Sequence, residues 1–110
     1  SIYPGKVPVE GFQRQAQLLE RASDEVAFMV GQLRKKGGLD LIQQANERLQ
    51  FAEGEADKLM FTLLKGFYRD PACGPKETMI LQETVEMVEK AVDRCRDAGN
   101  VVFQIVLKYS

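Results

Sequence analysis

Two segments of the chain carry acidic residues four positions apart in a matching local pattern. Glu53 precedes Asp57 in the first segment, and Glu89 precedes Asp93 in the second. In both segments an apolar residue comes before the Glu and a basic residue follows the Asp. On a helix this spacing places the two carboxylates on one face, beside the apolar seam. Asp97 continues the second segment by one further turn.

Helical bundles bind metal ions through carboxylates that project inward from facing helices, so the pattern indicates a metal site. The chain contains no histidine and only two cysteines, so the candidate ligands are all oxygen atoms. Such ligands favour Mg²⁺, Ca²⁺ or Mn²⁺ and permit iron. The expected ligands of a divalent metal or iron are therefore Glu53, Asp57, Glu89, Asp93 and Asp97.

Three long amphipathic stretches must position these carboxylates. Apolar residues recur at intervals of three and four, which is typical of helices, over residues 10–36, 39–68 and 76–108. Gly37-Gly38 is expected to end the first helix with a left-handed cap, and residues 70–75 separate the other two. Because short breaks join long helices, neighbours should be antiparallel. The predicted fold is all-α, an antiparallel three-helix up-down-up bundle.

The predicted bundle forms one domain over residues 10–110, preceded by an extended N-terminal arm, residues 1–9, that contains two prolines. A hairpin that folds near residue 73 pairs residues at equal distances from its turn. It therefore brings Glu53 level with Asp93, and Asp57 level with Glu89. Four carboxylates at one level would be costly to bury unless a cation compensates their charge. The alternative is that these acids form a solvated surface.

The composition excludes several classes of function. The net charge is −1, from 15 basic and 16 acidic residues, so nothing favours binding to nucleic acid or an anionic membrane. No apolar run approaches the roughly 20 residues of a membrane span. No glycine-rich phosphate loop or Ser/His/Asp set is present, so an enzyme is not expected. Two cysteines as free thiols fit a cytoplasmic location.

The segments NERLQFAEGEAD (46–57) and VEKAVDRCRDAGNVV (88–102), followed by IVLK (105–108), resemble the PhoU-like phosphate transport regulators. The similarity is to the divergent branch that accompanies phosphate permeases, and it covers about residues 40–108. It implies metal binding by acidic motifs, which correspond to Glu53/Asp57 and Glu89/Asp93, with Asp97 one turn on. Family proteins usually contain two three-helix repeats, and this chain resembles the second repeat alone.

The resemblance implies a regulatory or accessory protein of inorganic phosphate transport. Such a protein would be cytoplasmic and peripheral to the membrane at most. Its partner would be a phosphate permease or a signalling protein. The alternative is a generic helical protein-interaction module with no metal or phosphate role.

Two regions are more apolar than one seam requires. One comprises residues 59–64 with Phe67 and Tyr68, and the other comprises residues 101–107, where Val101, Phe103, Ile105 and Leu107 lie off the seam. A helix that is apolar all round is normally buried all round, and three helices cannot cover these faces. The sequence therefore predicts self-association, as a homodimer that replaces the missing repeat.

Overall fold

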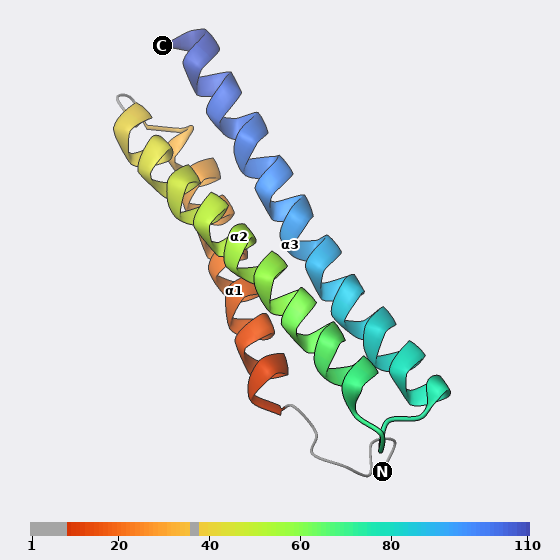
Figure 1. The fold of residues 1–110 in the computed structure, drawn as a ribbon. Coiled ribbons are helices and arrows are strands. Elements are labelled where there is room, and N and C mark those ends of the chain that lie inside the picture. The colour runs from red at the N-terminus through yellow and green to blue at the C-terminus, as the bar shows by residue number, and fades with distance from the viewer. Residues whose placement is uncertain (1–8, 36–37) are drawn as a thin grey trace.

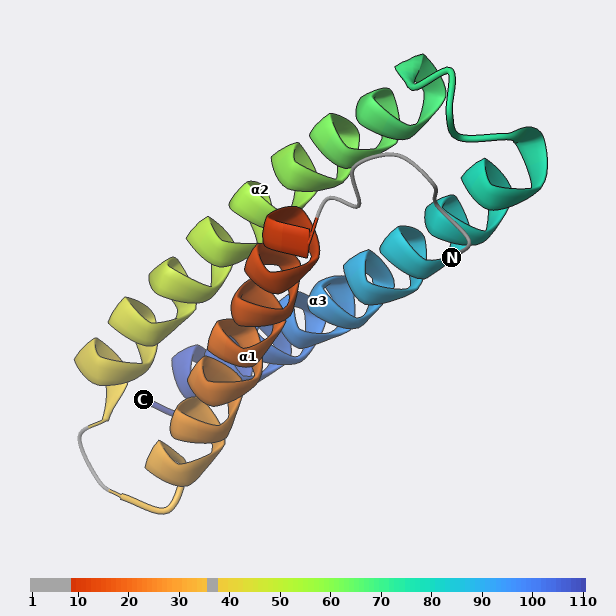
Figure 2. The same ribbon diagram turned by 90° about the horizontal axis from the view of Figure 1, so that it is seen from below.

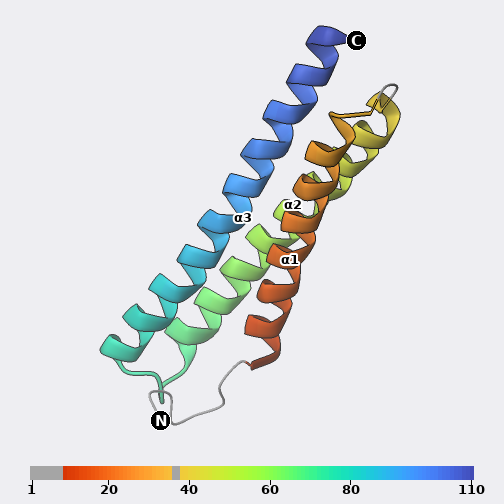
Figure 3. The same ribbon diagram turned by 180° about the vertical axis from the view of Figure 1, so that it is seen from behind.

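The structure, a computed structural model, describes residues 9–35 and 38–110, which include three α-helices. Helix α1 spans Val9–Gln32, α2 spans Leu39–Arg69 and α3 spans Pro75–Tyr109. All three helices pack against one another, and the described residues include no strand, which confirms an all-α fold of three packed helices. Figures 1 and 3 show the helices side by side, with the C-terminal end of α3 extending beyond the other two.

Contacts between distant residues show which parts of the helices meet. Glu25 late in α1 pairs with Arg48 early in α2. Near the other end of α2, the Tyr68 hydroxyl donates a hydrogen bond to Oε1 of Gln82, early in α3. Figure 2, a view from below, shows α1 lying over one side of the pair formed by α2 and α3. The α2/α3 pair is the part of the fold that carries the acidic segments.

The helix boundaries differ from the predicted ones mainly at the end of α1. The helix ends at Gln32 instead of continuing to Lys36, because tighter i→i−3 bonds follow: Leu33 N–H donates to the Val30 carbonyl, and Lys35 N–H donates to that of Gln32. Residues 36–37 lie outside the described residues, as do residues 1–8 of the predicted arm. Gly38 has φ −84° and is therefore not left-handed.

The core follows the predicted seams of α2 and α3. Its larger cluster joins all three helices through Leu18, Ala22, Met29, Ile42, Ala45, Leu49, Ala52, Ala56, Val92 and Val102. A second cluster of Leu63, Phe67, Leu81 and Val85 lies toward the α2–α3 turn. There the Phe12 ring stacks on Phe67 with 6.0 Å between ring centroids. These contacts hold α2 and α3 in the register that brings their acidic segments together.

The expected apolar seam of helix α1 is only partly its buried face, because it includes the fully buried Ala22 and Met29 but not two buried polar residues. Leu33 continues the heptad spacing of the apolar residues in this helix, yet its side chain is 42% exposed. Gln15 and Glu25 are buried instead. Both have partners, because the Gln15 amide donates to the Val85 carbonyl and Glu25 accepts two hydrogen bonds from Arg48. Buried polar groups with good partners are tolerated, so the buried face of α1 includes these two positions as well as apolar ones.

Gly99 of α3 lies directly against α2. A Cβ at this position would overlap Cδ2 of Leu49 and lie 2.9 Å from Oδ1 of Asn46. The absent side chain therefore lets the two helices approach at this level. None of the described helices has an apolar stretch of the length that crossing a bilayer requires.

Candidate metal site

Three of the five predicted ligands gather between α2 and α3. Glu53 comes from α2, and Glu89 and Asp93 come from α3. One carboxylate oxygen of each lies within 4.8 Å of those of the other two. The two acids of α3 share a face because they are four residues apart. We call Glu53, Glu89 and Asp93 the acidic cluster.

Glu89 is the deepest member of the acidic cluster. Glu89 is only 4% exposed, and neither of its carboxylate oxygens has a hydrogen-bond partner among the described residues. Burial raises the pKa of the Glu89 carboxyl to about 7, and the negative charges of Asp93 and Asp57 add to this effect. A buried carboxylate without a partner is expensive, so this group must hold a proton or face a cation.

Arg96 supplies a positive charge at the edge of the acidic cluster. Its Nη1 lies 2.9 Å from Oε1 of Glu53 and 3.5 Å from Oδ1 of Asp93. Its Nη2 lies 3.1 Å from Oδ1 of Asp97. The guanidinium therefore compensates Glu53 and Asp93 in part but forms no ion pair with Glu89. Arg96 was not among the predicted site residues, although its position three residues after Asp93 on a helix indicates an ion pair.

The remaining two predicted ligands lie outside the acidic cluster. Asp57 is exposed, and it acts on Glu89 only through its charge. Asp97 points to two arginines, with Oδ2 lying 2.9 Å from Nη2 of Arg94 and Oδ1 accepting from Arg96. Hydrogen bonds from Arg94 and Arg96 hold the pKa of Asp97 below its ordinary range. Asp97 is therefore part of an exposed ion-pair network in this structure.

An amide network continues the α2/α3 contact beyond the acidic cluster. Oδ1 of Asn100 accepts from Asn46 Nδ2 at 3.4 Å and from Gln50 Nε2 at 3.0 Å. Because Asn46 is only 9% exposed, these bonds satisfy polar groups that would otherwise be buried unpaired. The network fixes the level at which α2 and α3 meet, and so positions Glu53 against Asp93.

The chemistry of the acidic cluster fits a hard cation. Three carboxylates supply only oxygen ligands, which Mg²⁺, Ca²⁺ and Mn²⁺ prefer and iron accepts. The unpartnered oxygens of Glu89 are the structural feature that a cation would satisfy. Binding would require Glu53 and Asp93 to exchange part of their contact with Arg96 for the ion.

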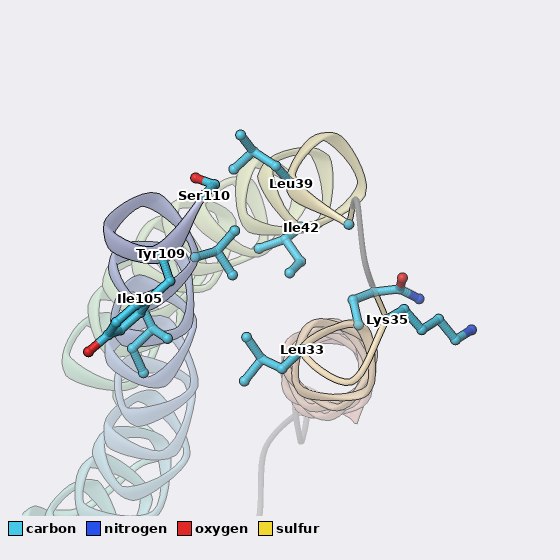
Figure 4. A pocket seen from close by; sticks show the side chains of 10 residues that line it. Leu33, Lys35, Leu39, Ile42, Ile105, Tyr109 and Ser110 are labelled. Atoms are coloured by element: carbon cyan, nitrogen blue, oxygen red, sulfur yellow. The ribbon is translucent and has the colours of Figure 1, made fainter.

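A hollow at one end of the bundle is chemically different. A cavity of about 380 Å³ lies between the C-terminal end of α3 and the α1–α2 connection, and it is lined mainly by apolar side chains. In Figure 4, Leu33 and Ile42 point into the space between the helices, whereas Lys35 points away from it. No cluster of titratable groups lines this cavity, so the acidic cluster remains the candidate site.

The comparisons with known proteins do not place the chain in a family. No protein-family model matches it, and searches of the curated proteins and of the solved structures found no match either. Any assignment of function therefore rests on the chain's own residues and on the resemblance described above.

Proposed function

We propose that this chain is a PhoU-like regulatory or accessory protein of inorganic phosphate transport that binds a divalent metal or iron through Glu53, Glu89 and Asp93. Its helices would form the up-down-up repeat of that family. It would have no catalytic activity of its own and would act in the cytoplasm by binding a phosphate permease or a signalling protein.

The observation that carries the proposal is the environment of Glu89. Its two buried carboxylate oxygens lack hydrogen-bond partners among the described residues, and the carboxylates of Glu53 and Asp93 lie beside them. A cation between the three carboxylates would offset both the burial and the mutual repulsion. The resemblance of residues 46–57 and 88–102 to PhoU-like regulators supports the same residues and supplies the link to phosphate.

A generic helical interaction module is the second candidate. Arg96 favours it, because the chain itself compensates part of the charge on Glu53 and Asp93. A protonated Glu89 would then complete a purely structural cluster, with no metal and no role in phosphate transport.

Calorimetric titration with Mg²⁺, Mn²⁺ and anaerobic Fe²⁺ separates the two candidates. We expect the wild-type chain to bind at least one of these ions, and the double variant Glu89→Gln/Asp93→Asn to lose that binding. The matched control is Glu83→Gln/Asp24→Asn, which makes the same chemical changes at two exposed positions. A wild-type chain that binds none of the three ions would favour the interaction module.

The phosphate role needs its own test. We expect phosphate uptake by cells to change when the protein is removed, and to be restored by the wild-type chain. The Glu89→Gln/Asp93→Asn variant should fail to restore uptake, whereas the Glu83→Gln/Asp24→Asn control should succeed. Unchanged uptake after removal would contradict the phosphate role even if metal binding were found.

A further inference from the structure

The two apolar regions predicted to mediate self-association are interrupted by covered residues. Phe67 is 1% exposed and stacks on Phe12, and Phe103 packs against the larger core cluster. Phe61 and Leu107 remain 56% and 46% exposed. Neither region is therefore a continuous apolar surface.

A more regular apolar surface runs along the outer side of α3. At alternating intervals of four and three residues, α3 carries Ile80, Thr84, Met87, Ala91, Arg94, Ala98, Val101 and Ile105. We call these residues the outer stripe. Its large apolar members are exposed by 40% at Ile80, 69% at Met87, 58% at Val101 and 43% at Ile105.

The outer stripe is a second heptad seam on the same helix. The core of the chain uses the seam that lies one residue later, which includes Leu81, Val85, Val92 and Val102. Six of its eight members are apolar, the exceptions being Thr84 and Arg94. Apolar residues at intervals of four and three over more than three heptads are typical of helices that pair in coiled coils. The chain's own helices leave the large members of this second seam exposed, and solvent-exposed apolar stripes of this kind mark interfaces.

We propose that the outer stripe of α3 pairs antiparallel with the outer stripe of a second copy of this chain. The pairing that uses its full length places Ile80 opposite the partner's Ile105. It also places Met87 opposite the partner's Ala98, and Arg94 opposite the partner's Ala91. Met87 and Arg94 thus each meet an alanine, which leaves room for their long side chains in the interface, and the two isoleucines meet at its ends.

The charges beside the outer stripe favour the same register. Lys90 and Asp97 occupy equivalent positions, each one residue before an alanine of the stripe. In the antiparallel pairing Lys90 faces the partner's Asp97, and the two-fold symmetry creates this opposite-charge pair twice. The pair would add to the contacts that Asp97 already makes with Arg94 and Arg96 of its own chain. A parallel pairing would instead set Arg94 against the partner's Arg94, which places like charges in the interface.

A hollow in the outer stripe fits the proposed pairing. It has a volume of about 320 Å³ and is lined by Asn100, Val101, Gln104, Ile105 and Lys108. The partner's Ile80, which lies opposite Ile105, would enter it. Coiled coils seat each such side chain among four residues of the facing helix. Val101, Gln104, Ile105 and Lys108 have the spacing of those four residues.

Light scattering during gel filtration tests the surface, in a buffer with a metal chelator so that the result is independent of the acidic cluster. At chain concentrations of tens of micromolar we expect a wild-type dimer. Met87→Glu/Val101→Glu should yield monomers of unchanged helical circular dichroism. The control Phe61→Glu replaces an equally exposed apolar residue on α2 and should remain dimeric. A monomeric wild type, or dissociation by Phe61→Glu alone, would overturn the proposal.

Disulfide trapping tests the register. Thr84 lies opposite the partner's Val101 in the proposed pairing, so a mixture of Thr84→Cys chains and Val101→Cys chains should form a covalent dimer on mild oxidation. The background carries Cys73→Ser and Cys95→Ala. Each variant alone should not cross-link, because its two thiols would lie on the order of 25 Å apart at 1.5 Å per residue. Cross-linking of either variant alone would overturn the antiparallel register, and so would a mixture that forms no covalent dimer.

Discussion

The Nη1 atom of Arg96 on α3 lies 2.9 Å from Oε1 of Glu53 on α2. The same nitrogen lies 3.5 Å from Oδ1 of Asp93, so one guanidinium compensates two members of the acidic cluster. Glu89, the third member, has no such partner among the described residues. This arrangement makes Arg96 a competitor of any cation that the carboxylates bind, because both would use Glu53 and Asp93.

Replacement of Arg96 by glutamine should therefore strengthen cation binding. Loss of the competing ion pair, which is partly buried, should contribute about 1 kcal/mol, or a decrease in Kd of roughly fivefold to tenfold. The matched control is Arg94→Gln, which removes an arginine of the same helix that pairs with Asp97 in solvent. Calorimetric titration of both variants and the wild type measures the effect. Weaker binding by Arg96→Gln than by Arg94→Gln would contradict the competition.

The stability of the metal-free chain should fall as the pH rises from about 4.5 to about 7. Burial is the main reason that the pKa of the Glu89 carboxyl rises from 4.5 to about 7 on folding. Between these values the folded chain binds more protons than the unfolded chain, so raising the pH favours unfolding. The full shift sets a ceiling of about 3 kcal/mol, and solvent near the cluster should reduce the loss to about 1–2 kcal/mol.

Urea unfolding at pH 5 and pH 8, in the presence of a chelator, measures this loss. Glu89→Gln should remove this contribution, so its free energy of unfolding should change less between pH 5 and pH 8 than that of the wild type. Glu83→Gln, at an exposed position of the same helix, should retain the wild-type dependence. Equal pH dependence in the two variants would show that Glu89 is not the group responsible.

Two glycine-to-alanine substitutions should change stability in opposite directions. At Gly54 a Cβ would meet nothing within 4 Å, so alanine should stabilise α2 by about 0.5–1 kcal/mol through its higher helix propensity. At Gly99 a Cβ would overlap Leu49, a fully buried core residue, so alanine should destabilise the chain by about 1–3 kcal/mol. Thermal unfolding of both variants makes the comparison. A stabilising Gly99→Ala would mean that Leu49 moves aside at little cost.

The sequence by itself determined the three helices and the core faces of two of them. Residues such as Ile42, Leu49, Val85 and Val92 recur at the helical interval, and all four are buried. This information is local, because side chains three or four residues apart lie on the same face of a helix, whatever that helix packs against. The position of the α2–α3 turn was also readable, since Pro75 begins α3. Helix direction and the turn together indicated that Glu53 and Asp93 lie at the same level.

Only the tertiary structure decided which carboxylates converge and which polar residues of α1 are buried. Asp57 follows Glu53 by four residues, and Asp97 follows Asp93 by four, yet both are exposed. Four residues exceed one helical turn by roughly 40°, so each such step moves a side chain partly away from the contact between the helices. Arg96 on α3 contacts Glu53 on α2, and this contact depends on the distance between the two helix axes. Glu25 is buried because Arg48 on another helix binds it with two hydrogen bonds. Which charged side chains are buried therefore depends on residues far away in the sequence, because the cost of burying a charge depends on which group faces it.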